Sequence, residues 1–229
     1  MVRSLLSQAW SVLLDNAPWM SWNLFLAFIP LVLSVLLFRQ TQLHASTLTL
    51  PPVGLRSRHR SFWWWIGVVV FVAFLPNAPY ILTDIIHFID QVQSANSTWF
   101  VTLVLIPLYI LFIWAGFEAY VLSLINLGYY LNRRGLTQWI LLAEMMLHGL
   151  SAIGIYLGRF LRFNSWDLVT RLDEVAMSVL DDLLGKRPLL AMTLTFLVVA
   201  GLYALFKPVH LALFTYWRSR QSRSQFAID

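Results

Sequence analysis

Asp84 and His87 are the residues whose types and spacing could most readily do chemistry. They follow two prolines, Pro76 and Pro79, in an otherwise apolar stretch. Side chains three residues apart lie close on a helix, so this carboxylate and imidazole could act as acid and base or bind a ligand together. Each proline removes a backbone donor and so frees a carbonyl group. The break and the helix that restarts after it are therefore the first candidate site.

More polar residues accompany this pair after the break and at the end of a later apolar run. On the restarted helix, polar side chains fall on one face and apolar side chains on another. A second group of polar residues follows the fourth apolar run. Because successive runs cross the membrane in alternate directions, this group lies on the same side of the membrane as Asp84 and His87. The sequence predicts a site for a small polar or ionic ligand there. Its candidate residues are Asn77, Tyr80, Thr83, Asp84, His87, Arg159, Arg162, Asn164 and Asp167.

The same residues also fit a purely structural role. An ion pair of Asp84 with Arg159 or Arg162 would fasten two helices without binding anything else. Asn77 is expected to cap the restarted helix, whose free backbone N–H groups would point into the break. Both alternatives remain open at the level of the sequence.

Metal and cofactor sites have little support. Asp84 and His87 supply two ligands, whereas a catalytic zinc usually takes about three protein ligands. The third would have to come from His148, Glu144 or Asp167. The chain has no cysteine, which excludes thiolate ligands and a cysteine nucleophile. We therefore expect neither a metal nor a cofactor.

Three ionisable residues fall within apolar runs: Glu118, Glu144 and His148. An ionisable side chain inside a membrane is by default a functional candidate, for example in a proton relay. Glu144 and His148 are four residues apart, so the two could also satisfy each other on one helix face. Glu118, near the inner end of its run, is expected either to extend towards the membrane surface or to pair with Arg133 or Arg134.

Composition places the chain in a lipid bilayer. Hydrophobic residues make up 59% and charged residues 12%, with a mean hydropathy of +0.69, whereas soluble domains are about 45–50% apolar. Helical spans of about 20 residues cross a bilayer. We predict an all-α, polytopic bundle in one domain, 1–229, with a Pro-broken second span and amphipathic interfacial helices at 3–17 and 167–184. The spans are predicted at 22–38, 62–83, 99–122, 139–158 and 188–206.

Charge distribution predicts orientation and partners. Most of the 16 lysines and arginines lie in the first and third loops and the C-terminal tail, which favours a cytoplasmic C-terminus and an outer N-terminus. The fourth loop is an exception because it is also basic. Since these charges are explained by membrane topology, we expect the lipid bilayer, and no nucleic acid, as the partner. The sequence does not identify a protein partner, although an assembly protein would use the 167–184 helix to meet one.

Three segments resemble a known family. They are residues 22–30, beginning Trp-Asn-Leu-Phe-Leu-Ala, residues 75–87 around Leu-Pro-Asn-Ala-Pro-Tyr, and residues 154–167 around Gly-Arg-Phe-Leu-Arg-Phe-Asn. Together they resemble a bacterial membrane family catalogued as domain of unknown function thirteen sixty-one, over roughly residues 20–210. The resemblance implies a multi-pass protein of a bacterial, including cyanobacterial, cell membrane. It implies no activity. Its motif segments contain the candidate site residues around Asp84 and around Arg159.

Three functions follow from these observations. The first, which we prefer, is binding or translocation of a small polar or ionic ligand at an outward-facing polar cleft. The second is an assembly or accessory protein whose motifs fasten helices. The third is a membrane-embedded enzyme acting on a lipid-linked or headgroup substrate. Phosphate-binding loops, G-x-S-x-G and H-E-x-x-H are all missing from the sequence.

Overall fold

Long helices make up the part of the chain that the computed structural model describes, residues 2–39, 61–161, 170, 173 and 186–225. No strand occurs in these ranges. Five helical stretches are long and apolar enough to cross a membrane: Ala9–Arg39, Phe62–Ser94, Thr98–Arg133, Thr137–Arg159 and Lys186–Trp217. The predicted helical bundle with about five spans is confirmed. Its environment is a lipid bilayer, since only an apolar solvent suits such helices.

The first span is one continuous helix from near the N-terminus. Helix α1 (Val2–Ser34) includes Pro18 and Pro30 and ends in a wider π-helical turn, Val35–Arg39. The expected separate interfacial helix at 3–17 is therefore wrong as an independent element, because the chain stays helical through Pro18 into the span. The second expected interfacial helix, 167–184, lies outside the described residues except for positions 170 and 173.

The second span is broken where the prolines predict. Helix α3 (Phe62–Phe74) ends before Pro76, a short helix α4 (Asn77–Tyr80) and a tighter 3-10 turn (Ile81–Asp84) follow, and α5 (Ile85–Ser94) continues in nearly the same direction. The sequence suggested that Asn77 caps the restarted helix, but the structure shows that it does not. Its amide Nδ2 donates back to the carbonyl of Phe74 at 3.0 Å, which satisfies an acceptor that the break leaves free.

The third and fourth spans form a hairpin. Helix α6 (Thr98–Phe100) and a π-helical stretch (Val101–Leu105) lead into α7 (Ile106–Arg133), and a 3-10 turn (Thr137–Trp139) leads into α8 (Ile140–Arg159). Between them Gly135 has a φ of +73°, a left-handed conformation that glycine adopts most easily. The Leu136 N–H bonds to the Leu131 carbonyl at 3.0 Å and closes the end of α7.

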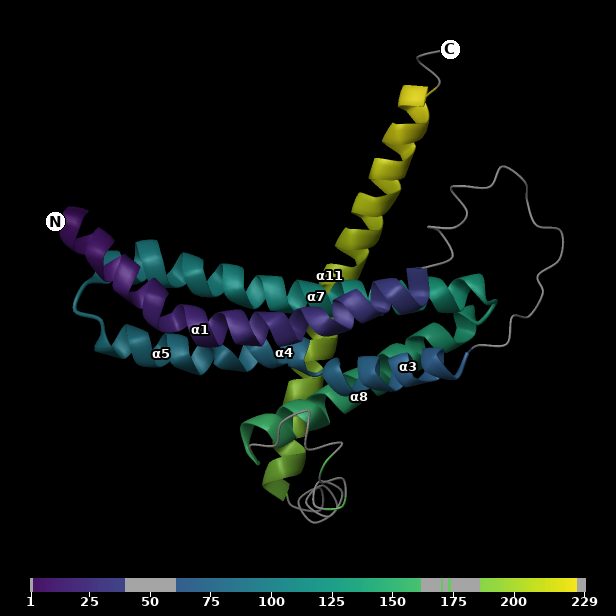
Figure 1. The fold of residues 1–229 in the computed structure, drawn as a ribbon, viewed down its shortest axis with the longest axis horizontal. Helices are drawn as coiled ribbons and strands as arrows, with labels where there is room; N and C mark the ends of the chain where they lie inside the picture. Colours follow the sequence, from purple (N-terminus) through teal and green to yellow (C-terminus); the bar gives the residue numbers. More distant parts are fainter. Residues whose placement is uncertain (1, 40–60, 162–169, 171–172, 174–185, 226–229) are drawn as a thin grey trace.

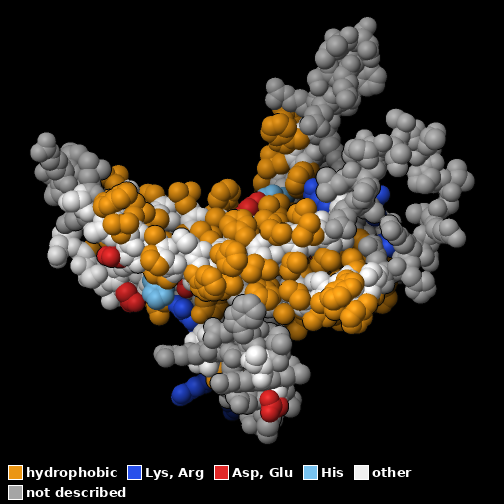
Figure 2. Space-filling model, in the orientation of Figure 1, with side chains coloured by type: hydrophobic (Ala, Val, Ile, Leu, Met, Phe, Trp, Pro, Cys, Tyr) orange, Lys and Arg blue, Asp and Glu red, His pale blue; other side chains and the backbone are white. Residues whose placement is uncertain are grey.

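Helix α7 is the centre of the bundle, and helix α11 (Lys186–Gln225) crosses it at a steep angle (Figure 1). Aromatic and branched residues of α7 are buried along most of its length: Tyr109, Phe112, Phe117, Tyr120, Val121, Leu124 and Ile125. The surface in Figure 2 is mostly hydrophobic, with charged side chains scattered towards its margins. Lipid-facing apolar side chains around a packed aromatic interior are what a bilayer requires.

Two glycines let the broken segment lie against its neighbours. A Cβ on Gly154 of α8 would lie 2.7 Å from Cβ and Cγ of Pro76, and a Cβ on Gly116 of α7 would lie 3.1 Å from Cβ of Ile81. Both distances are too short for ordinary side-chain contact. The break is therefore clasped between α7 and α8 because each helix has no side chain at the crossing.

Candidate functional site

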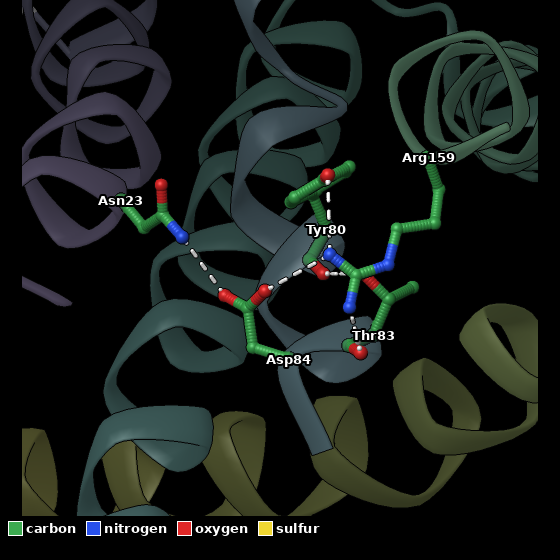
Figure 3. Close-up of polar contacts among 5 residues, drawn as sticks. All are labelled: Asn23, Tyr80, Thr83, Asp84 and Arg159. Atoms are coloured by element: carbon green, nitrogen blue, oxygen red, sulfur yellow. Dashed lines mark hydrogen bonds and ion pairs between the residues drawn. The ribbon is translucent and has the colours of Figure 1, made fainter. Parts of the chain in front are cut away.

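Asp84 is the buried centre of a polar cluster formed by three helices. It ends the 3-10 turn after the proline break and is only 1% exposed. Asn23 of α1 donates from Nδ2 to Asp84 Oδ2 at 2.9 Å, and Arg159 of α8 places Nη1 3.5 Å from Oδ1 (Figure 3). A buried carboxylate needs such partners because desolvation without them is costly.

Arg159 is the more accessible member of the cluster, with 24% of its side chain exposed. Its Nη2 donates to the main-chain carbonyl of Thr83 at 2.9 Å, whereas Nη1 lies 3.5 Å from the Tyr80 hydroxyl. The guanidinium carbon lies 5.7 Å from the centroid of the Tyr80 ring, within cation–π range. We call Asn23, Tyr80, Thr83, Asp84 and Arg159 the Arg159 centre.

Thr83 and Tyr80 contribute differently from what their side chains suggest. The Thr83 hydroxyl donates to the Tyr80 carbonyl at 2.7 Å, within its own turn, so Thr83 offers Arg159 its carbonyl and not its hydroxyl. The Thr83 carbonyl also accepts from the backbone N–H of Ile85 at the end of the 3-10 turn, and its two lone pairs allow it to accept from Arg159 as well. The proline break thus supplies the backbone acceptor to which Arg159 bonds most closely.

His87 does not join Asp84. Its side chain is exposed, and its ring lies 4.9 Å from the ring of Trp19. Trp19 donates to Asn16 Oδ1 at 3.0 Å, and the side-chain amides of Asn16 and Gln91 exchange hydrogen bonds of 2.8 and 3.3 Å. His87 therefore belongs to a separate polar group one turn further along α5, and an Asp84–His87 acid–base pair is not assembled in this conformation.

Of the remaining predicted site residues, one has a role in local helix structure and three lie outside the described residues. Asn77 bonds within its own turn. Arg162, Asn164 and Asp167 lie outside the described residues. The structure adds Asn23, which sequence reasoning did not place in the site. It is the only amide, hydroxyl or charged side chain within residues 22–33, and a polar residue isolated in an apolar span is a signal for an interhelical bond.

A second polar cluster lies nearer the other end of α8, around Glu144. Both carboxylate oxygens accept from Lys207 Nζ of α11, at 2.6 and 2.8 Å, and Oε1 also accepts from the Tyr203 hydroxyl at 2.7 Å. The expected mutual pairing of Glu144 with His148 is wrong. Helix α11 crosses the face of α8 and brings a stronger partner to Glu144 than the histidine one turn away.

His148 instead pairs with α7. Its Nδ1 lies 2.7 Å from the Tyr120 hydroxyl, and its ring is surrounded by Tyr120, Tyr203 and Phe196 at centroid distances of 5.7, 4.9 and 6.5 Å. We call Tyr120, Glu144, His148, Tyr203 and Lys207 the Glu144 centre.

Glu118 also has a different partner from the one predicted. Its Oε1 pairs with His210 Nε2 of α11, and not with Arg133 or Arg134. The two arginines instead lie over the rings of Tyr129 and Tyr130. No sequence signal identified Lys207 or His210, because the crossing of α11 over α7 and α8 decides both pairings.

No group of three histidine, aspartate or glutamate side chains in the described ranges is arranged to hold a metal ion. Within those ranges, neither His148 nor Glu144 lies with Asp84, since both belong to the Glu144 centre. What the Arg159 centre offers is a partly exposed guanidinium, a buried carboxylate and a phenol. This set can exchange hydrogen bonds and charge with a small ligand.

Comparison with known proteins gives a family without an activity. A family described as "Protein of unknown function (DUF1361)" matches residues 22–200. No curated protein matches the chain. No solved structure matches it either. The matched region contains Asn23, Asp84, Glu144 and Arg159, so both polar centres lie largely within it. The chain therefore belongs to the DUF1361 family, an integral membrane family of unknown function.

Proposed function

We propose that this protein binds a small polar or ionic ligand at the Arg159 centre and moves it across the membrane. The observation that carries the proposal is the uneven attachment of Arg159. Among the described residues it has one close hydrogen bond, to the Thr83 carbonyl at 2.9 Å, and two contacts at 3.5 Å, to Asp84 and Tyr80. A guanidinium has five donor hydrogens in a planar fork, so it can engage a carboxylate or phosphate while keeping its close bond.

Binding of an anion to Arg159 would loosen a helix contact. The ligand would compete with Asp84 for Nη1, while Asn23 would continue to hold Asp84 Oδ2. Asp84 would then lose its contact with α8 but keep its hydrogen bond to α1. A ligand that exchanges with an interhelical contact favours a second arrangement of those helices by its differential affinity. The proline break is a natural place for that rearrangement.

One face of α8 supports translocation across the membrane. Glu144, His148 and Ser151 are polar, Ile155 is apolar, and Arg159 ends the row. These positions follow the spacing of a single helical face, and from Glu144 to Arg159 they span about 22 Å at 1.5 Å per residue. Except for Arg159, all are buried. A row of buried polar groups interrupted by one isoleucine resembles a pathway with a closed apolar point.

The proposed orientation rests on the charge bias of the sequence, and the proposed bacterial membrane rests on the family resemblance. We place the protein in a bacterial plasma membrane with its N-terminus outside and its C-terminus in the cytoplasm, so that Arg159 faces outwards. Arg39, Arg133 and Arg134 then lie at the cytoplasmic ends of their helices, as the positive-inside rule favours. A periplasm-active and a cytoplasm-active reporter fused after Asp229 test this, and activity of the periplasmic reporter alone would reverse the orientation.

An assembly or accessory function is the second candidate, and the burial of Asp84 favours it. At 1% exposure, with bonds from α1 and α8, this carboxylate serves as a fastener for three helices. A protein whose polar centre only fastens helices has no use for an exchangeable ligand. The two candidates therefore differ in what happens to stability when anions are added.

A thermal-shift screen of the detergent-purified protein tests the proposal. The probes are chloride, acetate, glutamate, inorganic phosphate and short-chain phosphatidic acid, the last two distinguishing a free phosphate from a lipid headgroup. We expect at least one probe to raise the wild-type Tm, as a ligand selective for the folded state must. Arg159→Lys keeps the charge but loses the planar fork, so its shift should be reduced.

Arg133→Lys is the matched control, because it makes the same substitution at an exposed arginine outside the centre. Its shift should equal that of the wild type. A shift that persists in Arg159→Lys would place the ligand elsewhere. No shift with any probe would favour the accessory function, as would an Arg159→Lys protein that no longer folds.

A further inference from the structure

His148 is a buried ionisable side chain with one nitrogen unused. It is 0% exposed. Its Nδ1 lies 2.7 Å from the Tyr120 hydroxyl, whereas Nε2 has no hydrogen-bond partner among the described residues. Buried polar atoms are nearly always paired, because leaving one unpaired costs about 1–3 kcal/mol. An unpaired imidazole nitrogen inside a membrane span is therefore a sign of a role beyond packing.

The chemistry of the unused nitrogen depends on the tautomer. When Nδ1–H donates to the Tyr120 oxygen, Nε2 has a free lone pair and can accept a proton. The new N–H bond forms at that lone pair while an O–H bond of the proton donor, a hydronium ion, breaks to leave water, and the ring becomes an imidazolium. The rings of Tyr203 and Phe196 lie beside it at centroid distances of 4.9 and 6.5 Å. A cation is stabilised by an aromatic ring whose centre lies within about 6 Å, so only the Tyr203 ring is close enough.

Charged and titratable groups face His148 from three helices. Glu144 lies one turn before it on α8, Tyr120 comes from α7, and α11 contributes Tyr203 and Lys207. Glu144 favours a positive imidazolium, and Lys207 opposes it. Because Lys207 also holds Glu144 at 2.6 Å, a movement of α11 that separates Lys207 from Glu144 would free the carboxylate to stabilise a protonated His148.

Further polar side chains lie outside the Glu144 centre on α1, α7 and α11. The Lys207 side chain is 30% exposed, although the carboxylate it holds is 5% exposed. His210 follows three residues later on α11 and pairs with Glu118. Closer to the helix ends, Arg39 donates to Asn126 at 2.7 Å, and Asn126 donates to Ser34 at 2.8 Å. A proton route from His148 to the membrane surface would pass these pairs.

We propose that the Glu144 centre is a proton-carrying site, in which His148 takes up a proton at Nε2 from the Arg39 end of the bundle and the Glu144–Lys207 pair controls its release. The ligand of this site is the proton alone. This proposal goes beyond ligand binding at the Arg159 centre and does not depend on that binding. If both proposals hold, α8 connects them, since His148 and Arg159 lie on the same helix.

The first test is NMR of the full-length protein in lipid nanodiscs, with its histidines labelled with ¹⁵N. Of the five histidines, the His148 signal is assigned by replacing the other four one at a time. This assignment needs no change at His148, so it works even if His148 variants fail to fold. We expect the His148 ring to pass from neutral to imidazolium as the pH of the sample is lowered, because a proton carrier must reach both states. A ring that stays neutral throughout would overturn the proposal.

The second test measures proton flux into liposomes that contain the purified protein and a pH-sensitive dye, driven by a potassium diffusion potential. Wild-type liposomes should acidify faster than protein-free ones, and His148→Phe should return the rate to the protein-free level. His87→Phe is the matched control, since it makes the same change at an exposed histidine that is not part of the Glu144 centre, and should keep the wild-type rate. Equal rates for wild type and His148→Phe, or a wild-type rate equal to that of protein-free liposomes, would overturn the proposal.

Lys207→Met and Glu144→Gln test the control by the ion pair. If His148 had only a structural role, these two variants would not change the proton flux in opposite directions. Removing the like charge of Lys207 should raise the flux at neutral pH, and removing the carboxylate should lower it. A flux that falls equally in both variants would mean that the ion pair only maintains the fold, and it would contradict the proposed control.

Discussion

Asn23 donates from Nδ2 to Oδ2 of Asp84 across 2.9 Å and so joins the first span to the broken second span. The other oxygen of the same carboxylate faces Arg159. One buried carboxylate therefore holds α1 and α8 at the point where the second span loses its regular helical bonds. The break in the second span and the buried carboxylate that joins three helices are in one place.

Removing Asn23 should destabilise the protein. Asn23→Ala leaves Asp84 Oδ2 without its described donor, and an unpaired buried acceptor costs about 1–3 kcal/mol. Unfolding in mixed micelles, followed by circular dichroism, measures the loss. Ser21→Ala, at an exposed position two residues earlier on α1, is the control and should change little. An Asn23→Ala protein as stable as the control would show that Asp84 finds another donor.

Neutralising Asp84 separates its charge from its hydrogen bonds. Asp84→Asn keeps an acceptor for Asn23 and should cost about 1 kcal/mol, the value of an ordinary hydrogen bond. Both variants leave Arg159 without its counter-charge, but Asp84→Ala also removes the acceptor of Asn23, so it should cost about 1–3 kcal/mol more than Asp84→Asn. The same unfolding measurement applies. Equal losses would mean that the charge, and not the hydrogen bond, fastens the helices.

The two clasping glycines should tolerate no side chain. Gly154→Ala places a methyl group 2.7 Å from Pro76, and overpacking of this kind costs about 1–3 kcal/mol. Gly116→Ala, against Ile81, should behave alike. Gly149→Ala, on the same helix as Gly154 with no atom within 4 Å of the added group, should be neutral or stabilising by up to about 1 kcal/mol. Destabilisation by Gly149→Ala would contradict this packing.

Breaking the ion pair between α8 and α11 should destabilise the protein strongly, whereas replacing both partners should destabilise it only a little. Lys207→Met leaves Glu144 buried with only the Tyr203 hydroxyl, and we expect a loss of about 3 kcal/mol. The double variant Glu144→Gln with Lys207→Met should recover most of that loss, because no unpaired charge remains. A double-mutant cycle on unfolding free energies measures the coupling. Equal losses in the single and double variants would show that the pair is not coupled.

The fold was largely predictable because its signals are local. Apolar runs long enough to cross a bilayer predicted five helices, and Pro76 with Pro79 predicted the break that the structure shows between α3 and α4. The ends of the helices were less predictable. The first helix continues back through Pro18 to Val2, since a proline in a membrane helix removes one donor without forcing the chain to turn.

The sequence by itself determined that this is a helical membrane protein with a polar break in its second span, because apolar length and proline act on their own segment. Only the tertiary structure decided which charges meet. Lys207 takes Glu144 and His210 takes Glu118 because α11 crosses α7 and α8, and Asn23 reaches Asp84 because α1 packs beside the break. Pairings between distant segments depend on helix crossing and depth, which no local pattern encodes.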